Sequence, residues 1–167
     1  MTSSTPASLP DALKQLPGAW QCTGRGSLTW SVFRIYDASL YCADGSSYPD
    51  GRYALVLNYL RNLSADQIVA ASVMEMQRLA NPSDAELQTW TDELHRIMPD
   101  VTRGDTLIGV FDGTRGVRFF YNDQPSGEIA SAGFAHAFAS IWLSEGTRSP
   151  TLREALLGAS GAHAVQQ

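Results

Sequence analysis

The residues of this sequence that could do chemistry centre on one arginine between two glycines, Gly24-Arg25-Gly26. The surrounding residues are typical of a β-strand, and the glycines allow a close approach to the backbone. If the Arg25 side chain points toward a layer of helices, it becomes a cation at the floor of an apolar cleft. A buried arginine needs an anionic partner, so we expect either a carboxylate of the protein or the carboxylate or oxyanion of a ligand. The two strands predicted to follow that of Arg25 carry three tyrosines, Tyr36, Tyr41 and Tyr59.

Other catalytic and cofactor-binding patterns are incomplete or missing from the sequence. Thr29 stands at the third glycine position of a dinucleotide-binding loop, and a strand, not a helix, is predicted to follow. There is no Gly-x-Ser-x-Gly nucleophile motif. His95, His136 and His163 are too widely spaced for a local metal cluster. A lone histidine such as His136 is more often a packed or surface side chain than a ligand. The sequence therefore predicts no cofactor and no metal site.

The composition is that of a single globular domain with no cationic surface for nucleic acid. The chain has 167 residues, 44% apolar and 17% charged, with a net charge of -5 and a pI near 5.0. This length suits one domain with a substantial core. A nucleic-acid protein needs a positive surface to release counterions from phosphates, so the acidic balance argues against that class. We expect a monomer or a weak oligomer.

No segment of the sequence is long and apolar enough to span a membrane. Residues 1–8 lack the basic start and apolar stretch of a secretory signal, which predicts a cytoplasmic protein, or a periplasmic one if a signal peptide has been removed. Cys22 and Cys42 are too few for a disulfide scaffold or a zinc site. They could face each other across the first predicted hairpin, but free buried thiols are the favoured interpretation.

Strand and helix patterns follow one another in an order that is typical of an antiparallel α+β fold. Two helix starts carry a capping box, with Ser64 followed by Gln67 and Ser83 followed by Glu86. The last helix is predicted to start at Ser149. The predicted strands cover residues 19–30, 32–43, 53–61, 105–111, 116–121 and 126–130, and a further helix covers 131–144. We expect a flexible arm at residues 1–17, one domain at 18–158 and a flexible tail at 159–167.

Several segments resemble the chalcone-isomerase-like domains in order and spacing. Residues 24–41 resemble their opening hairpin, and Tyr59-Leu-Arg-Asn-Leu-Ser64 resembles their third strand running into the first long helix. Gly104-Asp105, Phe119-Phe-Tyr-Asn122 and Gly127-Glu-Ile129 resemble their later hairpin, and residues 134–143 and 149–158 resemble their C-terminal helices. The similarity is greater to the bacterial members than to the plant enzymes. It implies the chalcone isomerase fold, an open-faced β-sandwich in which helices cover a large antiparallel sheet.

The resemblance also implies where a site would lie. In the plant enzymes an arginine and several polar groups hold a chalcone while its phenolate adds within the molecule to form a flavanone. Their arginine corresponds to Arg25 and their first threonine to Tyr36. Their tyrosine, asparagine and late hydroxyl residue correspond to Ile68, Glu75 and Ile141. An isoleucine cannot donate a hydrogen bond, and each donor to a developing oxyanion is worth about 3–4 kcal/mol of barrier, so we expect no useful isomerisation of chalcones.

Three functions remain open at this stage. Because the family includes fatty-acid-binding members, the first is binding of a small hydrophobic carboxylate such as a fatty acid by Arg25, Tyr36, Tyr59, Ile68 and Ile141. The second is an isomerase or intramolecular lyase for a chalcone-like substrate, with Arg25 as electrophile and Tyr36 as proton donor. The third is a non-binding structural module in which Arg25 is paired inside the fold. A cavity of about 300 Å³ or more that touches Arg25 would favour the first two.

Overall fold

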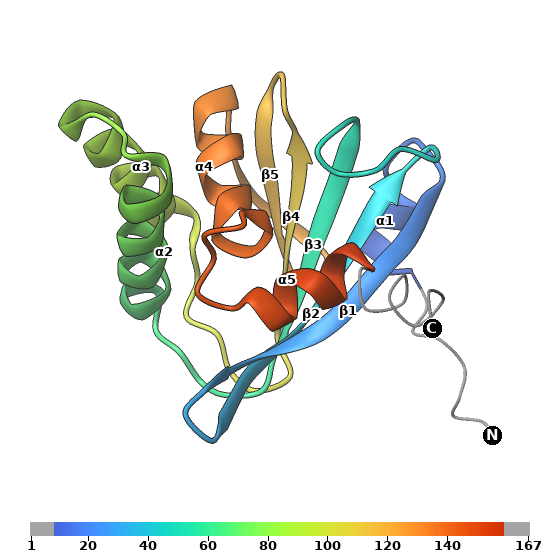
Figure 1. Cartoon of the computed structure of the whole chain (residues 1–167), viewed down its shortest axis with the longest axis horizontal. Coiled ribbons are helices and arrows are strands. Elements are labelled where there is room, and N and C mark those ends of the chain that lie inside the picture. Colours follow the sequence, from blue (N-terminus) through green and yellow to red (C-terminus); the bar gives the residue numbers. More distant parts are fainter. Residues whose placement is uncertain (1–8, 159–167) are drawn as a thin grey trace.

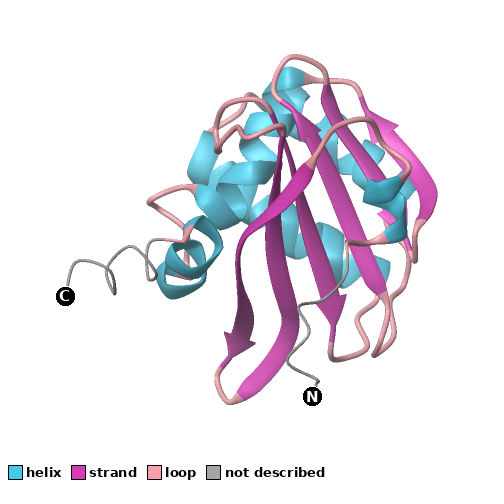
Figure 2. Ribbon diagram, turned by 90° about the vertical axis from the view of Figure 1, so that its right-hand side faces the viewer, coloured by secondary structure: helices cyan, strands magenta, loops and turns pink. Residues whose placement is uncertain are grey.

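A computed structural model describes residues 9–158 and shows a six-stranded antiparallel sheet with its strands in the order β1 to β6. Helices α2 to α5 lie on one face of this sheet, and the short helix α1 lies on the other (Figure 1, Figure 2). The strands are β1 (Trp20–Trp30), β2 (Phe33–Ala43), β3 (Arg52–Tyr59), β4 (Thr106–Asp112), β5 (Gly116–Tyr121) and β6 (Gln124–Ile129). The helices are α1 (Asp11–Lys14), α2 (Ala65–Ala80), α3 (Asp84–Ile97), α4 (Ala132–Leu143) and α5 (Pro150–Leu157). This is the helix-covered antiparallel sheet that the sequence predicts.

The central strands bury side chains on both faces, which explains their nearly continuous apolar sequences. Along β3, Tyr53, Leu55 and Leu57 point into the core under the helices. Ala54 and Val56 point into a smaller core on the other face. The side chains of this strand therefore alternate between the two faces, and this fixes which of them can reach the space between the sheet and the helices.

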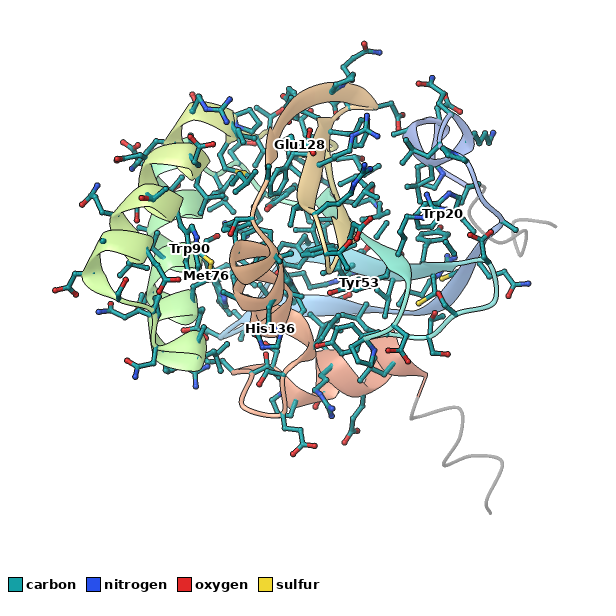
Figure 3. The ribbon with its side chains drawn as sticks, turned by 90° about the horizontal axis from the view of Figure 1, so that it is seen from above. Trp20, Tyr53, Met76, Trp90, Glu128 and His136 are labelled. Carbon is teal, nitrogen blue, oxygen red and sulfur yellow. The ribbon has the colours of Figure 1, made fainter. Side chains whose placement is uncertain are left out.

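The outer face of the sheet is covered in part by the segment that contains α1. Ala12 and Leu13 are fully buried, in the same core as Trp20. Figure 3 shows Trp20 beside α1, whereas Met76 and Trp90 lie on the far side of the molecule between the helices. The part of the expected N-terminal arm that surrounds α1 is thus packed rather than loose, because its apolar side chains cover the outer face. The rest of the arm, residues 1–8, and the tail, residues 159–167, lie outside the described residues.

Both predicted capping boxes form, and they fix the start of the two helices that follow the third strand. The Ser64 hydroxyl accepts a hydrogen bond from the Gln67 backbone at 3.1 Å, and the Gln67 side chain accepts one from the Ser64 backbone at 2.9 Å. The same reciprocal pair joins Ser83 and Glu86. At the last helix Ser149 is in the N-cap position with no capping bond from its side chain, so Pro150 alone marks this start locally.

Two glycines in β1 let α5 lie directly on the sheet. A Cβ atom at Gly24 would overlap the backbone carbonyl oxygen of Ala155, and a Cβ atom at Gly26 would press on the side chain of Leu152. Both glycines therefore face the helix layer. Because successive residues of a strand point to opposite faces, Arg25 between them points to the outer face, where it lies opposite Ser39 of β2.

The two cysteines are both free and do not face each other. Cys22 lies opposite Tyr41 in the strand register, whereas Cys42 lies opposite Gln21. Cys42 is buried, as expected, but Cys22 is exposed because it is on the outer face of the edge strand. Within residues 9–158, no helix combines the length and the apolar character needed to cross a bilayer.

Candidate functional site

A cavity of about 330 Å³ lies between the inner face of the sheet and helices α2, α4 and α5. Its walls are mostly apolar. The sheet contributes side chains such as Leu55, Leu107 and Phe119, and the helices contribute Phe138 and Leu152. Trp30 and Met74 also line it and are about half exposed, at 49% and 58%, so the cavity opens to solvent beside them. This volume is at the lower end of the range for small-molecule sites, roughly 300–1,000 Å³.

Two buried tyrosines supply the cavity with neutral hydrogen-bond donors. The rings of Tyr36 and Tyr59 meet edge to face with their centroids 5.3 Å apart, and both residues line the cavity. The Trp142 indole N–H donates to the Tyr36 hydroxyl oxygen at 2.7 Å. Within residues 9–158, the hydroxyl hydrogens of Tyr36 and Tyr59 have no acceptor. They are therefore available to an oxygen atom of a bound molecule.

Burial favours the protonated form of both hydroxyls. It raises the pKa of Tyr36 well above its ordinary value, and the hydrogen bond from Trp142 offsets only part of this effect. The pKa of Tyr59 is raised further, by burial first and then by the neighbouring Tyr36. Near neutral pH the pair consequently acts as two O–H donors and not as phenolate bases.

The edge of the cavity carries charge. Glu75 and Arg148 are the charged residues that line it. The Glu75 carboxylate accepts hydrogen bonds from Arg148 Nε at 2.6 Å and from Arg78 Nη2 at 2.7 Å, and its side chain is only 13% exposed. Burial by itself would raise the pKa of Glu75, but the hydrogen bonds and charges of the two arginines outweigh burial and hold the pKa below its usual value. Glu75 therefore stays ionised near neutral pH.

Arg25 lies outside this cavity, which corrects the position expected for it. Its side chain is exposed on the outer face of β1 and donates a long hydrogen bond from Nη2 to Cys22 Sγ, at 3.6 Å. Within residues 9–158, Arg25 forms no ion pair, so the expected carboxylate of the protein is missing there as well. The physical reason is the pair of glycines: their missing side chains make room for α5 on the inner face and leave Arg25 on the other.

The remaining residues predicted for the site come together. Tyr36 from β2, Tyr59 from β3, Ile68 from α2 and Ile141 from α4 all line the cavity, although the chain separates them widely. Arg148 was not predicted, because it lies just before the last helix with no local pattern to distinguish it from a surface arginine. Only its ion pair with Glu75, which is distant in the chain, identifies Arg148 as a residue of the site.

Neither of the two histidines within residues 9–158 lines the cavity. His136 is exposed on α4. On the surface, His95 Nδ1 lies 3.7 Å from Asp66 Oδ1. The third, His163, lies outside the described residues. In the part of the chain that the structure describes, no three His, Cys, Asp or Glu side chains gather closely enough to hold a metal ion.

Comparison with known proteins agrees with this architecture. The model of the chalcone isomerase-like family matches residues 7–158 of the chain. No curated protein matches the sequence. Among solved structures, a fatty-acid binding protein of Arabidopsis thaliana is similar with a TM-score of 0.64, covering 96% of this chain and 94% of that one at 15% sequence identity. At this identity the likeness establishes the fold.

Proposed function

The chain belongs to the chalcone isomerase-like family, and from this premise we propose that it binds a small apolar molecule with a carboxyl group, such as a fatty acid, in the cavity. The observation that carries the proposal is an apolar-walled cavity of about 330 Å³ that keeps two neutral donors, Tyr36 and Tyr59, and has its charges at one edge. This arrangement matches a ligand with a hydrocarbon body and one polar end. The similar fold of a fatty-acid binding protein is in keeping with the proposal.

The hydrocarbon body would supply most of the affinity. Each 100 Å² of apolar ligand surface removed from water contributes roughly 2.5 kcal/mol, from which the cost of immobilising the ligand is subtracted. Ile68 on α2 and Ile141 on α4 offer such contact. Because the volume is small, a medium-chain acid such as dodecanoate is the appropriate first probe.

We propose binding in preference to isomerisation because the cavity lacks the groups that the reaction would use. Ile68 and Ile141 stand in the wall where the resemblance implies hydroxyl donors, and Arg25 is on the other face of the sheet. A developing enolate would then lack both the arginine and two of the hydroxyl donors that the resemblance implies for lowering its energy. The unfilled volume likewise gives no support to a structural module with a closed core.

Two adjacent alanines of α2 provide a matched test. Ala71 lines the cavity, whereas Ala70 is exposed on the same helix. Ala71→Trp should fill the cavity and weaken dodecanoate binding by more than about tenfold, since the tail loses most of its buried surface. Ala70→Trp should bind like the wild type. Binding is measured by isothermal titration calorimetry, supported by native mass spectrometry of freshly purified protein.

The proposal fails if the wild-type protein binds neither dodecanoate nor dodecan-1-ol. It also fails if Ala71→Trp binds dodecanoate as tightly as Ala70→Trp, because the ligand would then lie outside the cavity. Thermal unfolding of both variants verifies that each is folded.

A further inference from the structure

We infer that Arg148, held in place by Glu75, is the residue that binds the carboxylate of the ligand. The inference rests on the proposed function and specifies the polar end of that site. It assigns a direct contact to Arg148 and a positioning role to Glu75. Neither role falls to Arg25, which the fold places on the opposite face of the sheet.

The distribution of charge in the cavity sets where a carboxylate can lie. A carboxylate taken out of water needs a cation or several hydrogen bonds, because desolvation of an unpaired charge is very costly. Arg148 is the cation among the residues that line the cavity. Its side chain is 64% exposed, so a carboxylate beside it keeps part of its hydration while the tail extends inward.

The ion pair leaves Arg148 with donors to spare. Only its Nε is engaged, by the Glu75 carboxylate at 2.6 Å. Within residues 9–158, its two terminal nitrogens have no hydrogen-bond partner. A guanidinium has five N–H donors in a rigid plane, so the terminal nitrogens can hold a second carboxylate while Nε stays on Glu75.

The local charge also favours an anion. Glu75 is shared by two arginines, with Arg78 on the same helix donating at 2.7 Å and Arg148 donating from the loop before α5. One carboxylate between two guanidinium groups leaves an excess positive charge at the edge of the cavity. A ligand carboxylate would neutralise that excess.

Glu75 is well placed to orient Arg148 because it is itself fixed. Its side chain is 13% exposed and lies on α2, one wall of the cavity. Arg78 holds the same carboxylate through its other oxygen. The guanidinium of Arg148 is thereby held at the cavity edge, where a free arginine side chain would sample many rotamers.

The test compares a carboxylate with an uncharged ligand of the same chain length. Dodecanoate and dodecan-1-ol are titrated by calorimetry into wild-type protein, Arg148→Gln, Arg148→Lys, Glu75→Gln and Arg103→Gln. Arg103 is exposed and does not line the cavity, so it is the matched control for removal of one surface cation. Each variant is checked for folding by its melting temperature.

Arg148→Gln should weaken dodecanoate by about tenfold or more, the loss expected for a charge-assisted hydrogen bond, and leave dodecan-1-ol within about twofold. Arg148→Lys keeps the positive charge but lacks the planar guanidinium, so its affinity for dodecanoate should lie between those of the wild type and Arg148→Gln. Glu75→Gln should weaken dodecanoate less than Arg148→Gln. Added salt should weaken dodecanoate binding to the wild type more than to Arg148→Gln.

Equal dodecanoate affinity in wild type and Arg148→Gln would overturn this inference while leaving the proposed function intact. An equal loss for the acid and the alcohol would also overturn it, because Arg148 would then shape the cavity and not bind the charge. A wild-type protein that binds neither ligand would overturn the proposed function and this inference together.

Discussion

Replacement of Gly24 by alanine should destabilise the protein, whereas replacement of its neighbour Arg25 should not. A Cβ atom at position 24 would overlap the backbone carbonyl oxygens of Ala155 and Leu156. Backbone atoms cannot rotate away as a side chain can, so α5 would have to move off the sheet. The φ angle of Gly24 is not in the left-handed region, so the cost comes from space and not from backbone conformation.

The size of the effect follows from what α5 buries. Its Leu152 and Leu156 are 3% and 0% exposed, and both belong to the core under the helices. Forcing extra atoms into a packed contact costs about 1–3 kcal/mol. Each kcal/mol lowers the melting temperature of a domain of this size by about 2–4 °C, so Gly24→Ala should melt about 2–12 °C lower.

Two neighbouring substitutions serve as internal controls. Arg25→Ala alters an exposed side chain and should change stability by no more than about 0.5 kcal/mol. Gly26→Ala should have an intermediate effect, because its new Cβ would meet Leu152 Cδ1, which can rotate away, and Ala155 Cβ, which cannot. Circular dichroism melts and urea titrations of the three variants give the ranking. A larger loss for Arg25→Ala than for Gly24→Ala would refute the placement of β1, since Arg25 would then face the helices.

Two further predictions concern the tyrosines of the cavity. Trp142→Phe removes the indole donor to Tyr36 and should lower the free energy of unfolding by about 0.5–1.5 kcal/mol more than Trp90→Phe does. Trp90 is the control because its indole donates no hydrogen bond within residues 9–158. Urea unfolding measures the difference, and equal losses for the two variants would contradict the prediction. Because burial raises the pKa of Tyr59, the folded chain holds the phenolic proton more tightly than the unfolded chain does. The unfolding free energy should therefore be insensitive to this group below the ordinary tyrosine pKa of about 10 and should fall as the pH rises above it. Tyr59→Phe should make that alkaline loss shallower in urea titrations, and an unchanged slope would count against the burial of the hydroxyl.

Much of the fold could be predicted because its signals are local. The capping boxes at Ser64 and Ser83 and the alternation along β3 each depend on a few neighbouring residues. The orientation of Arg25 depends instead on an irregularity in the pairing of β1 with β2, where the register shifts between Cys22 and Gly24. A β-bulge of this kind changes which residues share a face, and it cannot be located from the alternation pattern alone. The glycines did indicate a close approach to the backbone, but they could not indicate that α5 is the segment that makes it.

The family resemblance predicts the positions of the residues that line the cavity, but not their chemistry. Tyr36, Ile68 and Ile141 line one cavity from a strand and two helices, so the positions implied by the family resemblance are brought together by the shared fold. The chemistry of Ile68 and Ile141 differs from that of the corresponding residues in the plant enzymes, because an isoleucine offers apolar surface where a hydroxyl would offer a directed hydrogen bond. A wall of this kind discriminates poorly among hydrocarbon bodies, each methylene being worth about 0.8 kcal/mol, and needs a separate polar contact to fix the ligand's orientation. Arg148 can provide that contact only because Glu75, 73 residues away in the chain, holds it at the edge of the cavity, and a pairing over that distance has no local sequence signal.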